Sequence, residues 1–148
     1  MKQKVRLFKS LLAGLKELER FVRNGLHLQS GKPFAQLGGM RSREALANWL
    51  LCVSANAAVG EERFIFTSDP AGGDGLIFDK NTGETVQTEH IYIPSPRVGA
   101  PANNVEAQIL QAIEKKRNKG GAAYASGKTL AWKIHEELAG ADQAVEIV

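Results

Sequence analysis

A short turn between two apolar segments constrains the fold of this 148-residue chain more than any other feature of its sequence. The segments Leu76–Phe78 and Thr85–Ile93 are rich in aliphatic, β-branched and aromatic residues, which is typical of strands. The turn Lys80–Gly83 lies between them. A connection this short joins two strands as an antiparallel hairpin. We therefore expect a sheet built around residues 74–93.

Helical periodicity precedes this hairpin. Apolar residues recur at steps of three and four near the N-terminus, which predicts a helix ending near Arg23; they are Val5, Phe8, Leu11, Leu12, Leu15, Leu18 and Val22. Residues 26–39 contain Pro33 and end in two glycines, so they are expected to form a loop. A second helix is predicted from a Ser42 cap to Gly60. Its expected apolar face comprises Leu46, Trp49, Leu50, Val53 and Ala57.

The remaining segments complete a predicted α/β domain. Strands are expected at Arg63–Thr67 and Thr129–Ile134, with a helix between a cap at Asn103 or Asn104 and Gly120. A helix continuing into residues 136–138 is the alternative for the last strand. The predicted order is helix, helix, strand, strand, strand, helix, strand. This order and the length favour one domain with a four-stranded mixed sheet flanked by helices.

The charges are distributed unevenly along the chain. The first 24 residues carry seven basic and two acidic side chains, whereas residues 61–105 carry three basic and seven acidic ones. A metal-dependent enzyme acting on a phosphate polymer needs both kinds of segment, because acids hold the cation and bases meet the backbone. The alternative interpretation is an uneven scatter of surface charge.

Cellular location and membrane association are also constrained. A single cysteine, Cys52, excludes an intramolecular disulfide and favours the reducing cytoplasm. It falls in an apolar part of a predicted helix, where cysteine usually belongs to the core. The longest apolar-rich segment, Ala45–Val59, is interrupted by Asn48, Ser54 and Asn56 and is shorter than a membrane span. We therefore expect no membrane association.

Two common kinds of site find little support in the sequence. The segment from Gly121 to Thr129 resembles a phosphate-binding loop, but its glycine spacing and its position after a helix do not fit. The histidines His27, His90 and His135 lie far apart, so they do not predict a zinc site.

Three acids form the strongest candidate constellation. Asp74 precedes the first hairpin strand beside Gly75, and Glu89 lies in an otherwise apolar part of the second strand. Hairpin pairing can bring Asp74 and Glu89 together, and Glu44 at the start of the preceding helix can add a third oxygen ligand. Neighbouring carboxylates are favoured when a cation such as Mg²⁺ compensates them. The alternative is a solvent-facing Asp in a turn and an exposed Glu on an edge strand.

These acids and the element order resemble the PD-(D/E)xK restriction-endonuclease-like superfamily. The resemblance covers residues 40–134 and leaves the helix in residues 1–24 as an addition. Gly73-Asp74-Gly75 resembles the family's Pro-Asp-Gly segment, with Gly73 in place of proline. The resemblance implies that Asp74, Glu89 and Glu44 bind Mg²⁺.

The sequence departs from this family at the lysine that assists the attacking water. Two positions after Glu89 the residue is Ile91. His90 adjoins Glu89 but points to the opposite face of a regular strand, so a bulge would be needed to bring it to the metal. Lysines from elsewhere are the other candidates for this role, namely Lys116, Lys119 and Lys128.

The sequence thus suggests a Mg²⁺-dependent nuclease acting on DNA or RNA. Basic residues are expected to follow the nucleic-acid backbone; they are Arg41, Arg43, Lys115, Lys116 and Lys119. A second hypothesis is an inactive nuclease-like module that binds nucleic acid or a protein partner. A third is that the amphipathic N-terminal helix docks onto a partner or onto a second copy, giving a homodimer.

Overall fold

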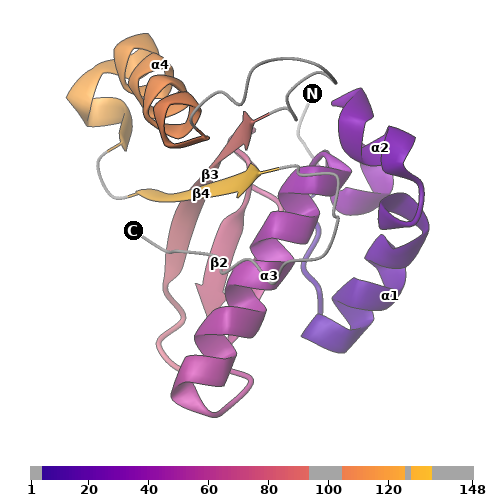
Figure 1. Cartoon of the computed structure of the whole chain (residues 1–148). Coiled ribbons are helices and arrows are strands. Elements are labelled where there is room, and N and C mark those ends of the chain that lie inside the picture. Colours follow the sequence, from indigo (N-terminus) through magenta and orange to yellow (C-terminus); the bar gives the residue numbers. More distant parts are fainter. Residues whose placement is uncertain (1–4, 94–104, 126–127, 135–148) are drawn as a thin grey trace. The chain divides into compact units, whose positions relative to one another are not determined.

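The computed structural model describes residues 5–93, 105–125 and 128–134 (Figure 1). The chain divides into two compact units, Met1–Glu89 and His90–Val148. The first unit contains three α-helices, a short 3₁₀ helix, one strand before the hairpin and the hairpin strands, of which β3 (Thr85–Ile93) crosses the unit boundary. The second contains α4 (Val105–Ala125) and β4 (Lys128–Ile134).

The first helix, α1 (Leu11–Val22), begins later than the apolar periodicity predicts. The Ser10 hydroxyl accepts a hydrogen bond from the Ala13 amide at 3.2 Å and so caps the helix. Val5 and Phe8, which fit the helical period, therefore precede the helix.

The predicted loop at residues 26–39 is wrong in part, because it contains α2 (Gly25–Ser30) and the 3₁₀ helix η1 (Ala35–Leu37). The Asn24 side chain accepts a hydrogen bond from the Leu26 amide and starts α2. Gly31 then adopts a left-handed conformation and ends it. Asn24 thus lies just after α1, as expected, and also caps the start of a short second helix.

The segment before α1 lies along the edge of the first strand, β1 (Phe64–Thr67). Leu7 forms an antiparallel bridge with Thr67. The Arg6 amide donates to the Ser68 hydroxyl at 2.8 Å, and the Ser68 amide donates to the Arg6 carbonyl at 3.1 Å. These bonds satisfy backbone groups that an edge strand leaves unpaired.

The sheet differs from the predicted four-stranded mixed sheet, because β1, β2 (Leu76–Asp79) and β3 (Thr85–Ile93) pair antiparallel throughout. The predicted hairpin is confirmed, and β1 joins its other side. The loop between β1 and β2 is short enough for antiparallel pairing, so no parallel crossover arises here. The element order is also corrected by the extra helix α2.

The pairing register sorts the side chains between two faces of the sheet. Phe66 lies opposite Ile77, and Ile77 opposite Val86, on the face that carries the hydrophobic core. The other face carries Leu76 and Gln87, which lie opposite each other. Alternation along β3 therefore directs Thr88 to the core face and Glu89 to the other face.

The core lies between the helices and this first face. α3 (Ser42–Val59) packs against α1 and also against β1 and β2 (Figure 1). The rings of Phe8 and Phe66 stack at 4.5 Å between centroids. The fully or almost fully buried core residues are Phe8, Leu18, Phe21, Leu37, Met40, Ala45, Cys52 and Phe66. The predicted placement of Cys52 in the core is thus confirmed.

The predicted apolar face of α3 is wrong in part, although its member Trp49 does pack against the core. Its buried side chains include the polar residues Glu44, Asn48 and Asn56, whereas Leu46 and Val53 are only half-buried. The two asparagines bond to strand backbone at opposite ends of the sheet. Buried backbone groups must find partners, and these contacts rotate polar residues inward.

In the second unit, α4 runs through the glycine pair at residues 120–121, where its end was predicted. The strand predicted at residues 129–134 is present as β4, so the helical alternative for these residues is wrong. Asn103, Asn104 and residues 136–138 lie outside the described residues.

Candidate functional site

Extending the β2–β3 register beyond its last recorded pair gives Asp74 and Glu89 facing positions at one end of the hairpin. The β2–β3 register pairs Leu76 with Gln87, and the Thr88 amide donates to the Gly75 carbonyl at 3.0 Å. The next pair in this register is Asp74 with Glu89. It falls at a position of the non-hydrogen-bonded kind, in which facing side chains approach most closely, with Cβ atoms about 4.5–5.5 Å apart. The predicted convergence of these two acids thus agrees with the register.

Glu89 is buried, with 7% of its surface exposed, and Asp74 is half-buried. The alternative of an exposed glutamate on an edge strand is therefore wrong. Burial of a carboxylate costs free energy that a hydrogen-bond donor or a cation must offset.

The predicted third ligand, Glu44, is engaged at the start of α3. Its carboxylate accepts hydrogen bonds from the Arg41 amide, at 2.8 Å, and from the Arg41 guanidinium. The hydrogen bond and the charge of Glu44 raise the pKa of Arg41, burial opposes this rise, and the charge of Asp74 adds to it. Glu44 thus stabilises the helix start and Arg41, which also lies within the electrostatic field of Asp74.

Arg41 and Arg43, predicted to contact nucleic acid, are both half-buried around Gly31. The Arg41 Nε–H donates to the Gly31 carbonyl at 2.7 Å. A Cβ on Gly31 would lie 3.5 Å from the Arg43 guanidinium. The guanidinium groups of Arg41 and Arg43 therefore both lie where α2 ends and α3 begins. Arg41 also bonds to Glu44.

Sequence reasoning missed Asp69, which is buried just after β1. Its Oδ1 accepts from the Ala71 amide at 2.8 Å, and its Oδ2 accepts from the Gln87 side chain at 3.3 Å. Extending the β1–β2 register places Asp69 opposite Asp74. The predicted strand bounds could have identified Asp69. If β1 pairs antiparallel with β2, the extended registers of the sheet place Asp69 level with Asp74 and Glu89 across the strands.

The residue two positions after Glu89 is Ile91, which is buried and carries no charge, so this position supplies no cation. β3 is continuous from Thr85 to Ile93, so His90 points to the face opposite Glu89, as predicted for a regular strand.

The predicted lysines belong to the second unit. Lys115 and Lys119 are exposed on α4, and Lys116 is half-buried. Lys128 is the first residue of β4. Their roles in catalysis and in binding nucleic acid stay predictions.

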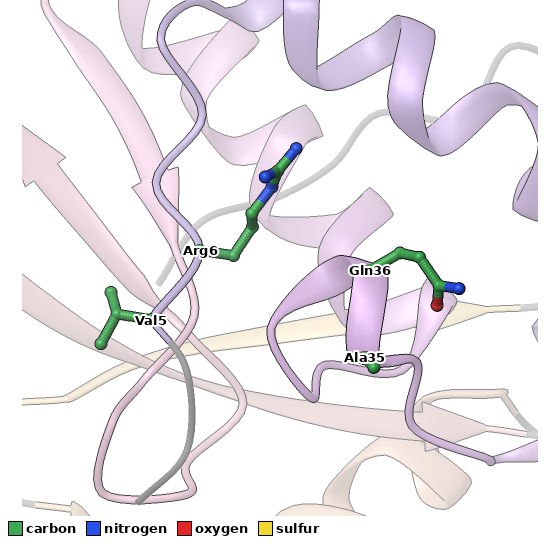
Figure 2. A pocket seen from close by; sticks show the side chains of 4 residues that line it. All are labelled: Val5, Arg6, Ala35 and Gln36. Carbon is green, nitrogen blue, oxygen red and sulfur yellow. The ribbon is translucent and has the colours of Figure 1, made fainter.

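A pocket of about 390 Å³ lies in another part of the first unit. Val5 and Arg6 from the N-terminal segment line it together with Ala35 and Gln36 of η1 (Figure 2). The Arg6 guanidinium also pairs with Glu17. Asp74 and Glu89 are not among these lining residues, so the pocket is separate from the acidic pair.

The donor set of Asp74 and Glu89 fits a hard divalent cation. Mg²⁺ prefers oxygen ligands and is usually held by one or two carboxylates, together with water and substrate phosphates. Among the residues that the structure describes, no group of three or more His, Cys, Asp or Glu side chains is placed to hold a metal ion. An ion at this position would therefore rely on two carboxylates.

No helix in the described part of the chain is long and apolar enough to cross a membrane. Comparisons of the chain with protein-family models, with curated proteins and with solved structures find no match.

Proposed function

We propose that this protein is a Mg²⁺-dependent nuclease that hydrolyses phosphodiester bonds of DNA or RNA. The observation that supports the proposal is the β2–β3 register, which, extended beyond Leu76 and Gln87, would bring Asp74 opposite Glu89. Asp74 and Glu89 would hold the ion. When bound, Mg²⁺ supplies a Lewis acid that activates water and stabilises charge on the phosphate.

The chain's own residues would bind and orient the substrate around this pair. Arg41 and Arg43 carry cationic groups at the start of α3, and Asp74 contributes to the field at Arg41. Guanidinium groups bind phosphate oxygens in a bidentate manner and suit contact with the nucleic-acid backbone. The lysines of α4 remain separate candidates for contact with the nucleic-acid backbone.

Cleavage assays test the proposal directly. The full chain is incubated with plasmid DNA, single-stranded DNA and RNA in the presence of Mg²⁺ or Mn²⁺. We expect Asp74→Ala with Glu89→Ala to lower cleavage at least a hundredfold. Glu84→Gln is the matched control, because Glu84 is an exposed acid at the other end of the same hairpin. Equal activity in the double variant and the wild type would refute the assignment.

A second candidate is a nuclease-like module that binds nucleic acid without cleaving it. Two observations favour it. The position of the family's lysine holds the buried Ile91, and the Glu44 carboxylate already accepts hydrogen bonds from Arg41. This candidate predicts salt-sensitive binding of DNA or RNA. Calorimetric titration with Mg²⁺ separates the two candidates, because a binding module gives no saturable site.

Location and assembly complete the proposal. The one cysteine, Cys52, supports a cytoplasmic protein that needs no disulfide. Leu12 and Leu26 are large apolar side chains exposed on α1 and α2, which supports a homodimer formed through these helices. Light scattering with a Leu12→Glu variant tests this, since a dimer of the wild type should then become a monomer.

A further inference from the structure

Asn48 is a fully buried amide that links α3 to both strands of the candidate site. None of its surface is exposed. Its Nδ2 donates to the Asp74 carbonyl at 3.1 Å, and its Oδ1 accepts from the Thr88 hydroxyl at 2.8 Å. Asp74 carries one of the two carboxylates, and Thr88 directly precedes Glu89. One side chain therefore bonds to the backbone of one acid and to the neighbour of the other.

Gly75 makes this contact possible. A Cβ at this residue would overlap Nδ2 of Asn48 and would lie 3.1 Å from its Cγ. Gly75 also has φ +149°, a conformation that other residues rarely adopt. The Gly75 carbonyl in turn accepts from the Thr88 amide. The carboxamide thus packs directly on the strand pair where Asp74 and Glu89 face each other.

We propose that Asn48 is the positioning residue that fixes the spacing of Asp74 and Glu89. The inference rests on the proposed function for its catalytic meaning. An amide suits this role because its nitrogen donates to a carbonyl while its oxygen accepts from a hydroxyl. A carboxylate lacks the donor, and an aliphatic side chain lacks both groups.

Asn56 provides a matched control on the same helix. It is also buried, and its Oδ1 accepts from the amides of Arg63 and Phe64, at 2.9 and 2.7 Å, at the far end of β1. Asn48→Ala and Asn56→Ala therefore remove the same group from the same helix, and each loosens one end of the sheet.

Two measurements on the full-length variants test the proposal. Amide hydrogen exchange is compared at Thr88 and at Phe64, each relative to Ile65 in the middle of β1. Asn48→Ala should speed relative exchange at Thr88 at least tenfold, and Asn56→Ala should do so at Phe64. Calorimetric titration with Mn²⁺ should show at least tenfold weaker binding by Asn48→Ala and a change below twofold for Asn56→Ala.

Thr88→Val is a milder variant that keeps the side-chain volume. It should weaken Mn²⁺ binding in the same direction, and it decides the question if Asn48→Ala does not fold. Equal losses of Mn²⁺ binding in the Asn48 and Asn56 variants would overturn the proposal, because global stability would then explain both. Unchanged Mn²⁺ binding in Asn48→Ala and Thr88→Val would also overturn it.

The proposed function fails in a different way. A wild type that binds no Mn²⁺, with Thr88 exchange still responding to Asn48→Ala alone, would refute the metal site. The local control of the strand ends by Asn48 would then be supported.

Discussion

At the scale of single residues, Gly75 is the residue of the candidate site whose backbone conformation and surroundings most restrict substitution. Its positive φ and the close approach of Asn48 exclude a side chain. We expect Gly75→Ala to lower the free energy of unfolding by about 2 kcal/mol or more, because it adds overlap to an unfavourable conformation. Urea denaturation measures this loss.

Gly83→Ala is the control for this prediction. Gly83 also has a positive φ, +76°, but a Cβ there meets nothing within 4 Å. Its cost should therefore be about 1 kcal/mol, from conformation alone. Equal costs at the two glycines would contradict the close approach of Asn48.

Cys52 gives a second prediction at this scale. Burial raises the pKa of its thiol to about 12, from 9.0. The unfolded chain ionises first as pH rises, so the contribution of the neutral thiol is present below about pH 9 and is lost between about pH 9 and 12. Wild type should lose more stability over this range than Cys52→Ala.

Thiol labelling at about pH 8 checks the same placement. Native protein should react only after unfolding, because the thiolate is the reactive form and the folded thiol stays protonated. Rapid labelling of the native protein would contradict burial of Cys52.

The inward face of α3 shows where prediction from single residues fails. Periodicity ranks Asn48 and Asn56 as polar and therefore outward-facing, and it selected Leu46 and Val53 for the core instead. The structure buries the asparagines because they satisfy backbone groups outside the helix, at Asp74 for Asn48 and at Phe64 for Asn56. A hydropathy pattern contains no information about such partners.

At the scale of elements, an ion pair fixes the pairing of β1 with β2. Arg63 donates from Nε and from a terminal nitrogen to the two carboxylate oxygens of Asp79, at 2.9 and 2.6 Å. These hydrogen bonds hold the pKa of Asp79 well below its usual range. The lowered pKa means that the pair stabilises the fold above about pH 4 and loses this effect as pH falls further.

We therefore expect Asp79→Asn to lower the melting temperature at about pH 7. The difference from wild type should shrink as pH falls below about 4. Thermal melts over this range measure it, with exposed Glu84→Gln as the comparison. A difference that stays constant with pH would contradict an ionic origin.

The hairpin was the most predictable element, because its turn is short and its strands are apolar. Its second strand, Thr85–Ile93, was placed with the observed bounds. The short helix α2 was missed because Asn24 and Gly25 also signal the end of a helix. The predicted mixed sheet was wrong because the loop between β1 and β2 is too short for a parallel crossover, so β1 pairs antiparallel with β2.

At the scale of the whole molecule, the N-terminal helix belongs to the core and is not an addition to it. Leu18 and Phe21 are buried with Phe66, and the Trp49 side chain donates to the Leu11 carbonyl at 2.8 Å. The basic N-terminal part and the acidic hairpin therefore belong to one compact unit.

The candidate site could be predicted in part. The hairpin that carries Asp74 and Glu89 depends on one short turn and was predictable, whereas the convergence of the two carboxylates stays a prediction. The engagement of Glu44 by Arg41 and the burial of Asp69 arise from packing between elements, so they required the structure.

Metal binding should stabilise the molecule as a whole. If the site binds Mn²⁺, a concentration 100-fold above the dissociation constant adds about 2.7 kcal/mol to the free energy of unfolding. The melting temperature should rise by several degrees and return when EDTA is added. Asp74→Asn with Glu89→Gln should abolish the rise, and an equal rise in this variant would place the ion elsewhere.

The pairing of Arg6 and Leu7 with Thr67 and Ser68 has a consequence for self-association. This segment covers part of the outer edge of β1, where an exposed strand could pair with another molecule. A chain that lacks residues 1–8 would lose the buried Phe8 ring and uncover this edge together. Such a chain is expected to aggregate through β1, so the first residues protect this edge as well as complete the core.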